Sequence, residues 1–310
     1  MNIFAGFKDI TFSGLIRQVL YIVLPSKMYI KFCYKHFSNR TINLREPKRL
    51  SEKWWWCMYY NKKYCPDLIR RVADKYEVQG YMQELKKGKY LKKTYGVYTN
   101  PEEINFNDLP DRFAIKITQE SGLNIICTNK ESLDVEATKK KLKDMLELAK
   151  FGKWRKHDLA WINNGNAKII VEEFIEKKNG EPFDEIRFLC FNGEPKFEYV
   201  VNDYLDSKGD VKHSYTRNTY DLDWNPIKVR MGGFEEGYTI KKPREYEEAL
   251  ALARDLCKEF LFLRLDLYVG DGKVYLSEFT VAPAGLNVFS PDCYDFIFGD
   301  MLKLPDVDLF

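Results

Sequence analysis

Histidine and closely spaced cysteines are scarce in this 310-residue sequence. The only histidines are His36, His157 and His213, and the seven cysteines include no CxxC pair. Protein zinc sites are built from clustered cysteine and histidine, and disulfide frameworks use an even number of cysteines. The composition therefore argues against both, and we expect reduced thiols and a cytoplasmic location.

Long apolar runs and a strong charge imbalance are also missing. The best apolar run, VLYIVLP at 19–25, is too short to span a bilayer, and no signal-peptide pattern is present. Lysine and arginine total 49 against 46 acidic residues, a formal net charge of +3. This near balance gives no reason to expect a nucleic-acid partner.

The N-terminus departs from that balance. Among the first fifty residues only Asp9 and Glu46 are acidic, while nine are basic: Lys8, Arg17, Lys27, Lys31, Lys35, Arg40, Arg45, Lys48 and Arg49. Apolar residues run between these charges at mixed helical spacing. Such a helix can contact the inner surface of an anionic membrane, or it can pack on the main domain with a solvated basic face, and both interpretations stay open.

Apolar residues make up 45% of the chain and aromatic residues 15%, enough for a sizeable core. We expect the aromatics mainly to fill that core rather than to stack on bases or sugars. Helices are predicted in 1–65, where Ser51 would cap the helix carrying WWWCMYY, and at 66–85, 134–150 and 243–260. Strands are predicted at 90–100, 111–118, 124–129 and 167–175, with hairpins at 184–203 and 264–280. This mixture predicts an α+β fold built on antiparallel sheets.

The closing hairpin, RLDLYVGDGKVYLSEFT at 264–280, carries charges on strands that should be half buried. Pairing about the Gly-Asp-Gly turn places Asp266 beside Glu278, and strand periodicity puts Arg264 and Thr280 on the same face. Two adjacent carboxylates repel each other unless a cation lies between them. We therefore predict a Mg²⁺ site, with a satisfied salt-bridge cluster as the alternative.

Two further stretches are compatible with nucleotide binding, each weakly by itself. FAIKITQESGLNIIC supplies Lys116 on a strand, followed by the Ser121-Gly122 turn, whose backbone N–H groups can hold phosphates. VEEFI at 171–175 ends a strand with acids and apolar residues, as an adenine slot requires.

Taken in order along the chain, these stretches resemble the ATP-grasp superfamily. Within it the chain is similar to the TupA-like group, which is associated with teichuronopeptide and capsular polysaccharide synthesis. The resemblance covers roughly residues 50–305 and rests on LSEKWW, VADKYEV, LPDRFAIK, SGLNIIC, IIVEEFI, FLCFNGEPKF, YDLDWN and LRLDLYVGDGKVYLSEFT.

The resemblance implies two α+β subdomains that hold ATP between antiparallel sheets, preceded by a helical N-terminal segment. We expect this segment at 1–65, a small subdomain with the phosphate loop at 66–165, and a large subdomain with the adenine hinge and metal site at 166–310. Lys75 would lie on a helix.

The resemblance also implies roles for individual residues. The nucleotide would be bound by Lys75, Lys116, Ser121, Gly122, Glu172, Glu173, Phe174 and Ile175, with Glu185, or less favourably Glu176, at the ribose. Mg²⁺ would be held by Asp266, Glu278 and Thr280. Arg264 would stabilise the tetrahedral intermediate or the transferred phosphoryl group, and Arg187 and Arg217 would contact the γ-phosphate or the substrate carboxylate.

The reaction implied is ATP-dependent amide formation through an acylphosphate. The carboxylate would be a uronic acid of a surface glycan or its precursor, and the amine an amino acid or small amine. The sequence departs from the family pattern at Thr280, where many members have Asn, and at Glu120, an acid in the phosphate loop.

Two alternatives remain open. One is a glycosyltransferase of surface polysaccharide synthesis, using the DLD acids at 221–223. The other is a non-catalytic ATP-grasp scaffold.

Overall fold

A computed structural model of the chain describes residues 19–20, 23–120, 122–155, 161–162, 165–179, 183–202, 215–232, 234–283 and 288–310. Ser121 and most of the first 22 residues lie outside these ranges, so the expectations placed on them stay predictions. Among the described residues, no helix is both long enough and apolar enough to cross a membrane.

The chain forms two compact units. The first takes Asp74–Gly80, Lys93–Phe174 and the described part of Met1–Cys33, and the second takes Tyr34–Ala73, Tyr81–Lys92 and the described part of Ile175–Phe310. Residues 166–174, predicted with the large subdomain, lie in the first unit. The reason is that β4 (Ile169–Glu173) hydrogen-bonds on both edges within the first unit's sheet.

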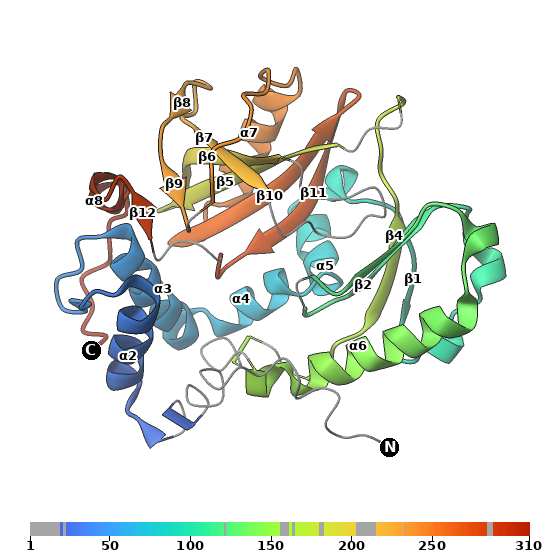
Figure 1. Cartoon of the computed structure of the whole chain (residues 1–310), viewed down its shortest axis with the longest axis horizontal. Helices are drawn as coiled ribbons and strands as arrows, with labels where there is room; N and C mark the ends of the chain where they lie inside the picture. The colour runs from blue at the N-terminus through green and yellow to red at the C-terminus, as the bar shows by residue number, and fades with distance from the viewer. Residues whose placement is uncertain are drawn as a thin grey trace. The chain divides into compact units, whose positions relative to one another are not determined.

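The first unit is built on a four-stranded antiparallel sheet in the order β1 (Thr94–Tyr98), β4, β2 (Phe113–Ile117) and β3 (Asn124–Cys127). The long helix α6 (Val135–Arg155) runs along this sheet (Figure 1). Its apolar stripe, Leu142, Met145, Leu146 and Ala149, is buried in one cluster with Phe113, Ile115 and Val171. The central position predicted for the strand at 167–175 is confirmed.

The second unit contains a six-stranded antiparallel sheet. Its order is β11 (Lys273–Thr280), β10 (Phe262–Gly270), β5 (Asp184–Phe191), β6 (Glu194–Asn202), β7 (Thr216–Tyr220) and β8 (Pro226–Ile227). Both predicted hairpins are present. Their turns, Asn192-Gly193 and Asp271-Gly272, have positive φ at each residue, as two-residue hairpin turns require.

The two faces of this sheet differ in polarity. Helix α7 (Tyr246–Leu256) packs by Ala249, Leu250, Ala253 and Leu256 against the face that carries Phe188 and Leu265 (Figure 1). Because side chains alternate along a strand, the register places polar and charged residues together on the other face. These are Glu185 and Arg187, Tyr199, Arg217 and Thr219, Arg264 and Asp266, and Glu278 and Thr280.

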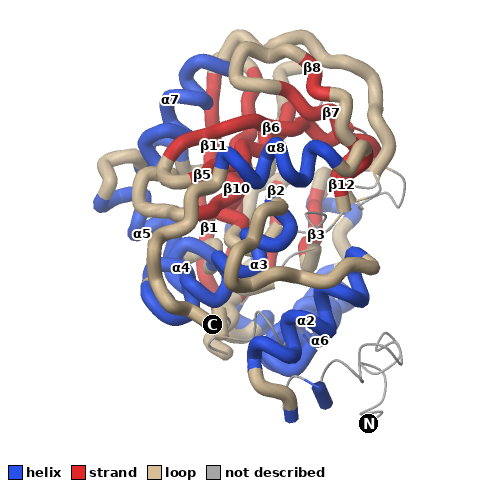
Figure 2. Tube along the Cα trace, turned by 90° about the vertical axis from the view of Figure 1, so that its left-hand side faces the viewer, coloured by secondary structure: helices blue, strands red, loops and turns tan. Residues whose placement is uncertain are grey.

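The remaining described elements are helices, 3₁₀ turns and one pair of short strands. Helices are α2 (Ser26–Ser38), α3 (Leu50–Tyr64), α4 (Pro66–Ala73), α5 (Glu77–Glu84) and α8 (Cys293–Met301). Four 3₁₀ turns lie in the described part, at Gly88–Tyr90, Pro101–Glu103, Phe106–Asp108 and Lys130–Ser132. Strands β9 (Arg230–Met231) and β12 (Phe289–Ser290) pair with each other, and α8 follows β12 (Figure 2).

The helix predicted at 66–85 is interrupted. Asp74 is buried and its carboxylate accepts hydrogen bonds from the N–H groups of Tyr76 and Glu77, at 2.8 and 3.2 Å. An aspartate in this role starts a new helix, so the chain turns between α4 and α5. The placement of Lys75 on a helix is therefore wrong, because it lies in this turn.

The helical character predicted for the N-terminal segment is confirmed in its described part, and Trp54, Trp55 and Trp56 are buried on α3. The expectation that Ser51 caps this helix is wrong, because α3 begins at Leu50.

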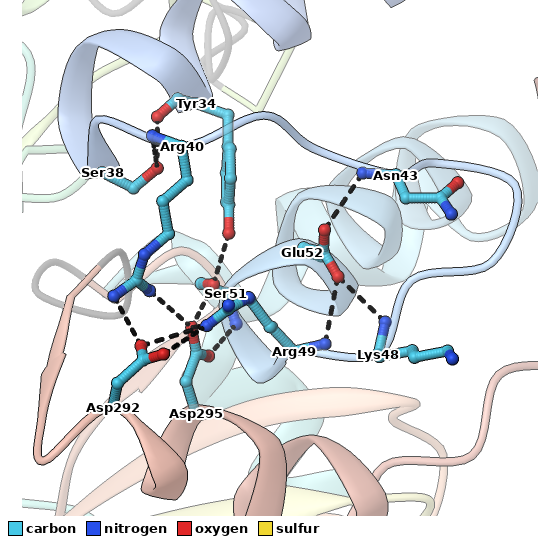
Figure 3. A network of polar contacts seen from close by, with 10 residues as sticks. All are labelled: Tyr34, Ser38, Arg40, Asn43, Lys48, Arg49, Ser51, Glu52, Asp292 and Asp295. Atoms are coloured by element: carbon cyan, nitrogen blue, oxygen red, sulfur yellow. Dashed lines mark hydrogen bonds and ion pairs between the residues drawn. The ribbon is translucent and has the colours of Figure 1, made fainter.

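Ser51 instead joins a polar network between α3 and α8 (Figure 3). The Asp295 carboxylate is completely buried and accepts hydrogen bonds from the Ser51 N–H and Oγ, at 2.8 and 2.7 Å. The Tyr34 hydroxyl lies 2.8 Å from the same Oγ, and Arg40 and Arg49 form ion pairs with the acids at the start of α8. This network fastens α8 to the N-terminal helices of the second unit.

Candidate functional site

The acids of the closing hairpin are direct neighbours on β10 and β11. The register pairs Asp266 with Glu278 and Arg264 with Thr280, which confirms the adjacency expected from the Gly-Asp-Gly turn. A bulge shifts the register between Asp266 and Leu267, so that Ser277 has no partner of its own on β10. All four side chains lie on the polar face of the sheet.

Arg264 lies among these side chains. Its guanidinium donates to both oxygens of Asp266, from Nε at 2.7 Å and from Nη2 at 2.5 Å. Nη2 also lies 3.0 Å from Glu278 Oε1 and 2.9 Å from Thr280 Oγ1, and the Thr280 hydroxyl donates to Glu278 at 2.6 Å. The salt-bridge cluster predicted as an alternative is thus present.

The two carboxylates have different surroundings. Asp266 is 1% exposed, whereas the Glu278 side chain is 33% exposed. Burial raises the pKa of Asp266 to about 7 and Glu278 adds to the rise, while Arg264 and Arg187 oppose it. A further cation close to such a buried carboxyl would stabilise its ionised form.

Two carboxylates and a hydroxyl are suitable oxygen ligands for Mg²⁺, which commonly takes one or two carboxylates and completes its shell with water and substrate phosphates. Within the described part of the chain, no group of three or more His, Cys, Asp or Glu side chains could hold a metal ion. Asp266 and Glu278 are therefore at most a partial donor set, and metal binding by them and Thr280 stays a prediction.

A second ion pair on β5 continues the cluster. Arg187 donates to Glu185 Oε2 from Nη2 at 2.6 Å and from Nε at 3.0 Å, and its Nε lies 3.7 Å from Asp266 Oδ2. Burial alone would raise the pKa of Glu185, but Arg187 and a 2.7 Å hydrogen bond from Ser277 lower it. Glu185 therefore stays ionised, bound to Arg187.

Tyr199 and Arg217 extend the charged row across β6 and β7. The Tyr199 hydroxyl lies 3.2 Å from Arg264 Nη1. The Arg217 guanidinium lies 5.1 Å from the centre of the Tyr199 ring and 3.7 Å from that of Phe234. The structure thus gathers Arg187, Arg217, Arg264, Glu185 and the three predicted metal ligands on one face of one sheet.

The predicted phosphate-binding residues lie in the first unit. Lys116 on β2 forms an ion pair of 2.9 Å with Glu172 on β4. The Lys75 ammonium contacts the carbonyl oxygens of Ile117 and Glu120, at 3.3 and 2.5 Å, so it braces the backbone of the loop. Glu120 is buried, and it does not turn outward as a solvated acid would.

Gly122 adopts a φ of +79° in this loop, and a Cβ there would meet no atom within 4 Å. Glycine is therefore needed for its backbone conformation. Such turns present N–H groups toward an anion, which is compatible with the predicted phosphate role.

The predicted adenine segment crosses from one unit to the other. Glu172, Glu173 and Phe174 belong to the first unit, and Ile175 is the first residue of the second unit's last segment. The Glu173 N–H donates to the Lys93 carbonyl at 2.8 Å. Nucleotide binding by these residues stays a prediction.

One of the acids proposed for a glycosyltransferase, Asp221, is hydrogen-bonded within a local turn. The Asp221 carboxylate accepts hydrogen bonds from the Asp223 N–H at 3.0 Å and from the Asn225 N–H and side-chain amide at 2.8 and 3.0 Å. The Asp221 carboxylate of the DLD motif therefore stabilises the turn after β7.

Sequence reasoning missed Tyr199, Ser277 and Thr219. Strand alternation within KFEYVV could have placed Tyr199 on the charged face once its register was known. The bulge that places Ser277 next to Glu185 has no signal in the sequence.

Comparison with known structures found several distantly similar proteins. D-alanine–D-alanine ligase from Bacillus anthracis is 18% identical, with a TM-score of 0.40 over 70% of this chain and 58% of that one, so this chain spans less than two thirds of that ligase. D-cycloserine synthetase DcsG is 16% identical, with a TM-score of 0.41 over 76% and 72% of the two chains. A RimK-domain ATP-grasp protein from Sphaerobacter thermophilus is 10% identical, with a TM-score of 0.40 over 75% and 67%.

Solved structures with bound nucleotide are among the matches. The Bacillus anthracis ligase, 16% identical with a TM-score of 0.39, was solved with ATP, and the ATP-grasp ligase PsnB, 11% identical with a TM-score of 0.38, with Mg and ADP. The comparison with curated proteins gave no match.

The model of the family described as TupA-like ATPgrasp matches residues 55–303, which is most of the chain and includes the polar face of the six-stranded sheet. The chain has the ATP-grasp fold, and it belongs to the TupA-like ATP-grasp family.

Proposed function

We propose that this protein is an ATP-dependent carboxylate–amine ligase that forms an amide through an acylphosphate. The observation that carries the proposal is the in-register pair Asp266 and Glu278, with Arg264 bonded to both. Phosphoryl transfer needs charge neutralisation around phosphates rather than a protein nucleophile. This cluster offers carboxylates for a metal and a guanidinium for an oxyanion within a few ångströms.

The proposed reaction needs no reactant other than ATP, the carboxylate and the amine. A carboxylate oxygen of the substrate attacks the γ-phosphorus of ATP, and the bond from that phosphorus to the ADP oxygen breaks. The amine nitrogen then attacks the acyl carbon and loses a proton, and phosphate leaves with the original carboxylate oxygen.

The residues on the polar face would have different electrostatic roles. Mg²⁺, when bound, supplies positive charge that neutralises the phosphate oxygens, and Asp266, Glu278 and Thr280 are the residues that would hold it. Arg264 would stabilise negative charge as it develops on the transferred group. Glu185 keeps Arg187 oriented toward the same face.

The substrate class follows from the family alone. The TupA-like group is associated with teichuronopeptide and capsular polysaccharide synthesis, and we infer a uronic acid of such a glycan, or its precursor, as the carboxylate. An amino acid or small amine would be the nucleophile. The basic N-terminal segment would then act at the membrane surface where such glycans are assembled.

An isotope experiment tests the reaction. Glucuronate and galacturonate labelled with ¹⁸O in the carboxylate are incubated with the protein, MgATP and a set of amino acids and amines, and the released phosphate is analysed by mass. Label in phosphate is the expected result, because the carboxylate oxygen must attack phosphorus. Glucose is the matched control, because it lacks the carboxylate.

ADP released with unlabelled phosphate would show hydrolysis or another acceptor and would contradict the acylphosphate route. Absence of ADP with every substrate would favour the scaffold interpretation.

A further inference from the structure

Arg217 on β7 is a buried cation that lies among aromatic rings. It is 6% exposed, and among the residues that the structure describes no carboxylate forms an ion pair with it. The rings around its guanidinium lie at 3.7 Å for Phe234, 5.1 Å for Tyr199 and 5.6 Å for Tyr215. Its Nη2 donates a long hydrogen bond of 3.4 Å to the Tyr215 hydroxyl, and the rings of Tyr215 and Phe234 stack on each other at 4.6 Å.

The other buried arginines of the same face are paired with acids. Arg264 donates to Asp266, and Arg187 donates to Glu185. Arginine keeps its positive charge inside proteins, and a buried charge is costly unless a counter-ion or strong hydrogen bonds compensate it. Cation–π contacts with the rings supply only part of that compensation. The Arg217 guanidinium is therefore suited to receive an anion from a ligand.

A neutral donor lies on the same face of β7 as Arg217. Arg217 Nε and Thr219 Oγ1 are both buried and have no hydrogen-bond partner among the residues that the structure describes. The two residues are two positions apart on β7, so they share a face, and Thr219 lies opposite Tyr199 in the register. Together they offer one positive charge and one hydroxyl, which match a planar monoanion such as a carboxylate.

This position is separate from the predicted metal ligands. Strand β7 lies three strands from β10 in the sheet, so the two backbones are about 14 Å apart at the usual strand spacing. Tyr199 bridges the gap, with its ring beside Arg217 and its hydroxyl 3.2 Å from Arg264. We therefore assign an anion at Arg217 to a position apart from the group that receives phosphate beside Asp266 and Glu278.

We propose that Arg217 and Thr219, enclosed by Tyr199, Tyr215 and Phe234, form an anchor site for a second carboxylate, one that the enzyme binds but does not activate. The distinction between a carboxylate that is activated and a second one that is only bound rests on the proposed ligase function. The anchored carboxylate belongs either to an amino acid that supplies the amine or to a neighbouring uronic acid of the glycan.

The test measures ligand-linked stability in the absence of ATP. Urea unfolding is recorded with sodium glucuronate, digalacturonate or L-alanine, and with inorganic phosphate, each against sodium chloride at equal ionic strength. The variants are Arg217→Met, Thr219→Val and the control Arg230→Met. Arg230 is half exposed and paired with Glu235 on the surface.

We expect at least one carboxylate to raise the unfolding midpoint of the wild type and of Arg230→Met, but not that of Arg217→Met. Loss of a charged hydrogen-bonding partner should weaken carboxylate binding by about ten- to a hundred-fold. Thr219→Val should weaken it less, and this isosteric change tests the site even if Arg217→Met fails to fold. A response to alanine identifies an amino acid as the source, and a response to a uronate identifies the glycan.

A carboxylate response that survives in Arg217→Met would overturn the proposal. So would a wild-type response to phosphate and to no carboxylate, or no response to any probe. Because ATP is absent, failure of the ligase function would leave this result standing. Conversely, if Arg217→Met still transfers ¹⁸O and its KM values for both substrates are unchanged, the anchor site is contradicted and the ligase function still stands.

Discussion

The stability of this protein should fall as the pH rises from 6 to 8, because of a buried carboxyl on β6. Glu198 is completely buried on the apolar face of the six-stranded sheet, and burial raises its pKa to about 8. Asp221 adds to the rise, and Lys242 and a hydrogen bond from Tyr246 oppose it.

The hydrogen bonds around Glu198 agree with a protonated carboxyl. The Tyr246 hydroxyl lies 2.8 Å from Glu198 Oε1 and 3.1 Å from the Leu222 carbonyl oxygen, and its one proton can satisfy only one of them. If Glu198 carries a proton it can donate to Tyr246, which then donates to Leu222. Within the described part of the chain Glu198 Oε2 has no partner, which would be costly for a charged carboxylate.

The sign and size of the effect follow from linkage. The folded pKa lies above the ordinary value of 4.5, so the folded state holds a proton that the unfolded state has already released. This stabilisation is fully present below pH 4.5 and is lost as the pH rises through 8. The loss amounts to about 2 kcal/mol between pH 6 and pH 8.

The assay is urea unfolding at pH 6, 7 and 8 for the wild type, for Glu198→Gln and for the control Glu247→Gln, whose side chain is exposed on α7. The amide that Glu198→Gln introduces is uncharged at every pH, so the wild type should lose about 2 kcal/mol more than this variant over the range. The control should follow the wild type. Equal slopes of unfolding free energy against pH for the wild type and Glu198→Gln would refute the reasoning. An infrared comparison at pH 7 is a second test: the wild type should show a protonated-carboxyl band that is missing in Glu198→Gln, and identical spectra would also refute it.

Three further predictions concern the site and the N-terminal network. Glu278→Gln should abolish ATP turnover while leaving urea stability within about 1 kcal/mol, because it removes a metal ligand and no core volume; wild-type turnover would count against the metal assignment. Lys116→Ala should weaken ATP binding at least about ten-fold in calorimetry, and unchanged affinity would remove the phosphate role. Asp295→Ala should cost about 2 to 4 kcal/mol in urea unfolding, since the Ser51 donors lose a buried acceptor, whereas the half-exposed Asp292→Ala should cost under about 1 kcal/mol; equal losses would contradict the network's importance.

Local chemistry explains how much the sequence revealed. Asn192-Gly193 and Asp271-Gly272 dictate tight hairpin turns, because these residues tolerate positive φ. A tight turn sets the strand register, and this register together with the strand period of two is sufficient to predict that Asp266 lies beside Glu278. The α+β class, the central strand at 167–175 and the cluster of Arg264, Asp266, Glu278 and Thr280 all follow from such short-range rules.

Other features needed the tertiary structure. The assignment of β4 to the first unit depends on which strands it pairs with, and the sequence carries no local signal for that choice. The apolar periodicity continues past Asp74, yet the helix ends there because the Asp74 carboxylate accepts hydrogen bonds from two following N–H groups. Lys75 therefore lies in a turn.

Arg217 and Glu198 show the same difference between what the sequence predicts and what the tertiary structure decides. Strand alternation predicts which face of the sheet each side chain occupies, and so the sequence determined the positions of the charges along the strands. Only packing decided that Glu198 is desolvated among apolar groups and that Arg217 lies among aromatic rings rather than beside a carboxylate of the described chain. Desolvation and pairing depend on atoms brought together from distant parts of the chain, and for this reason the chemistry of these groups was decided by the tertiary structure.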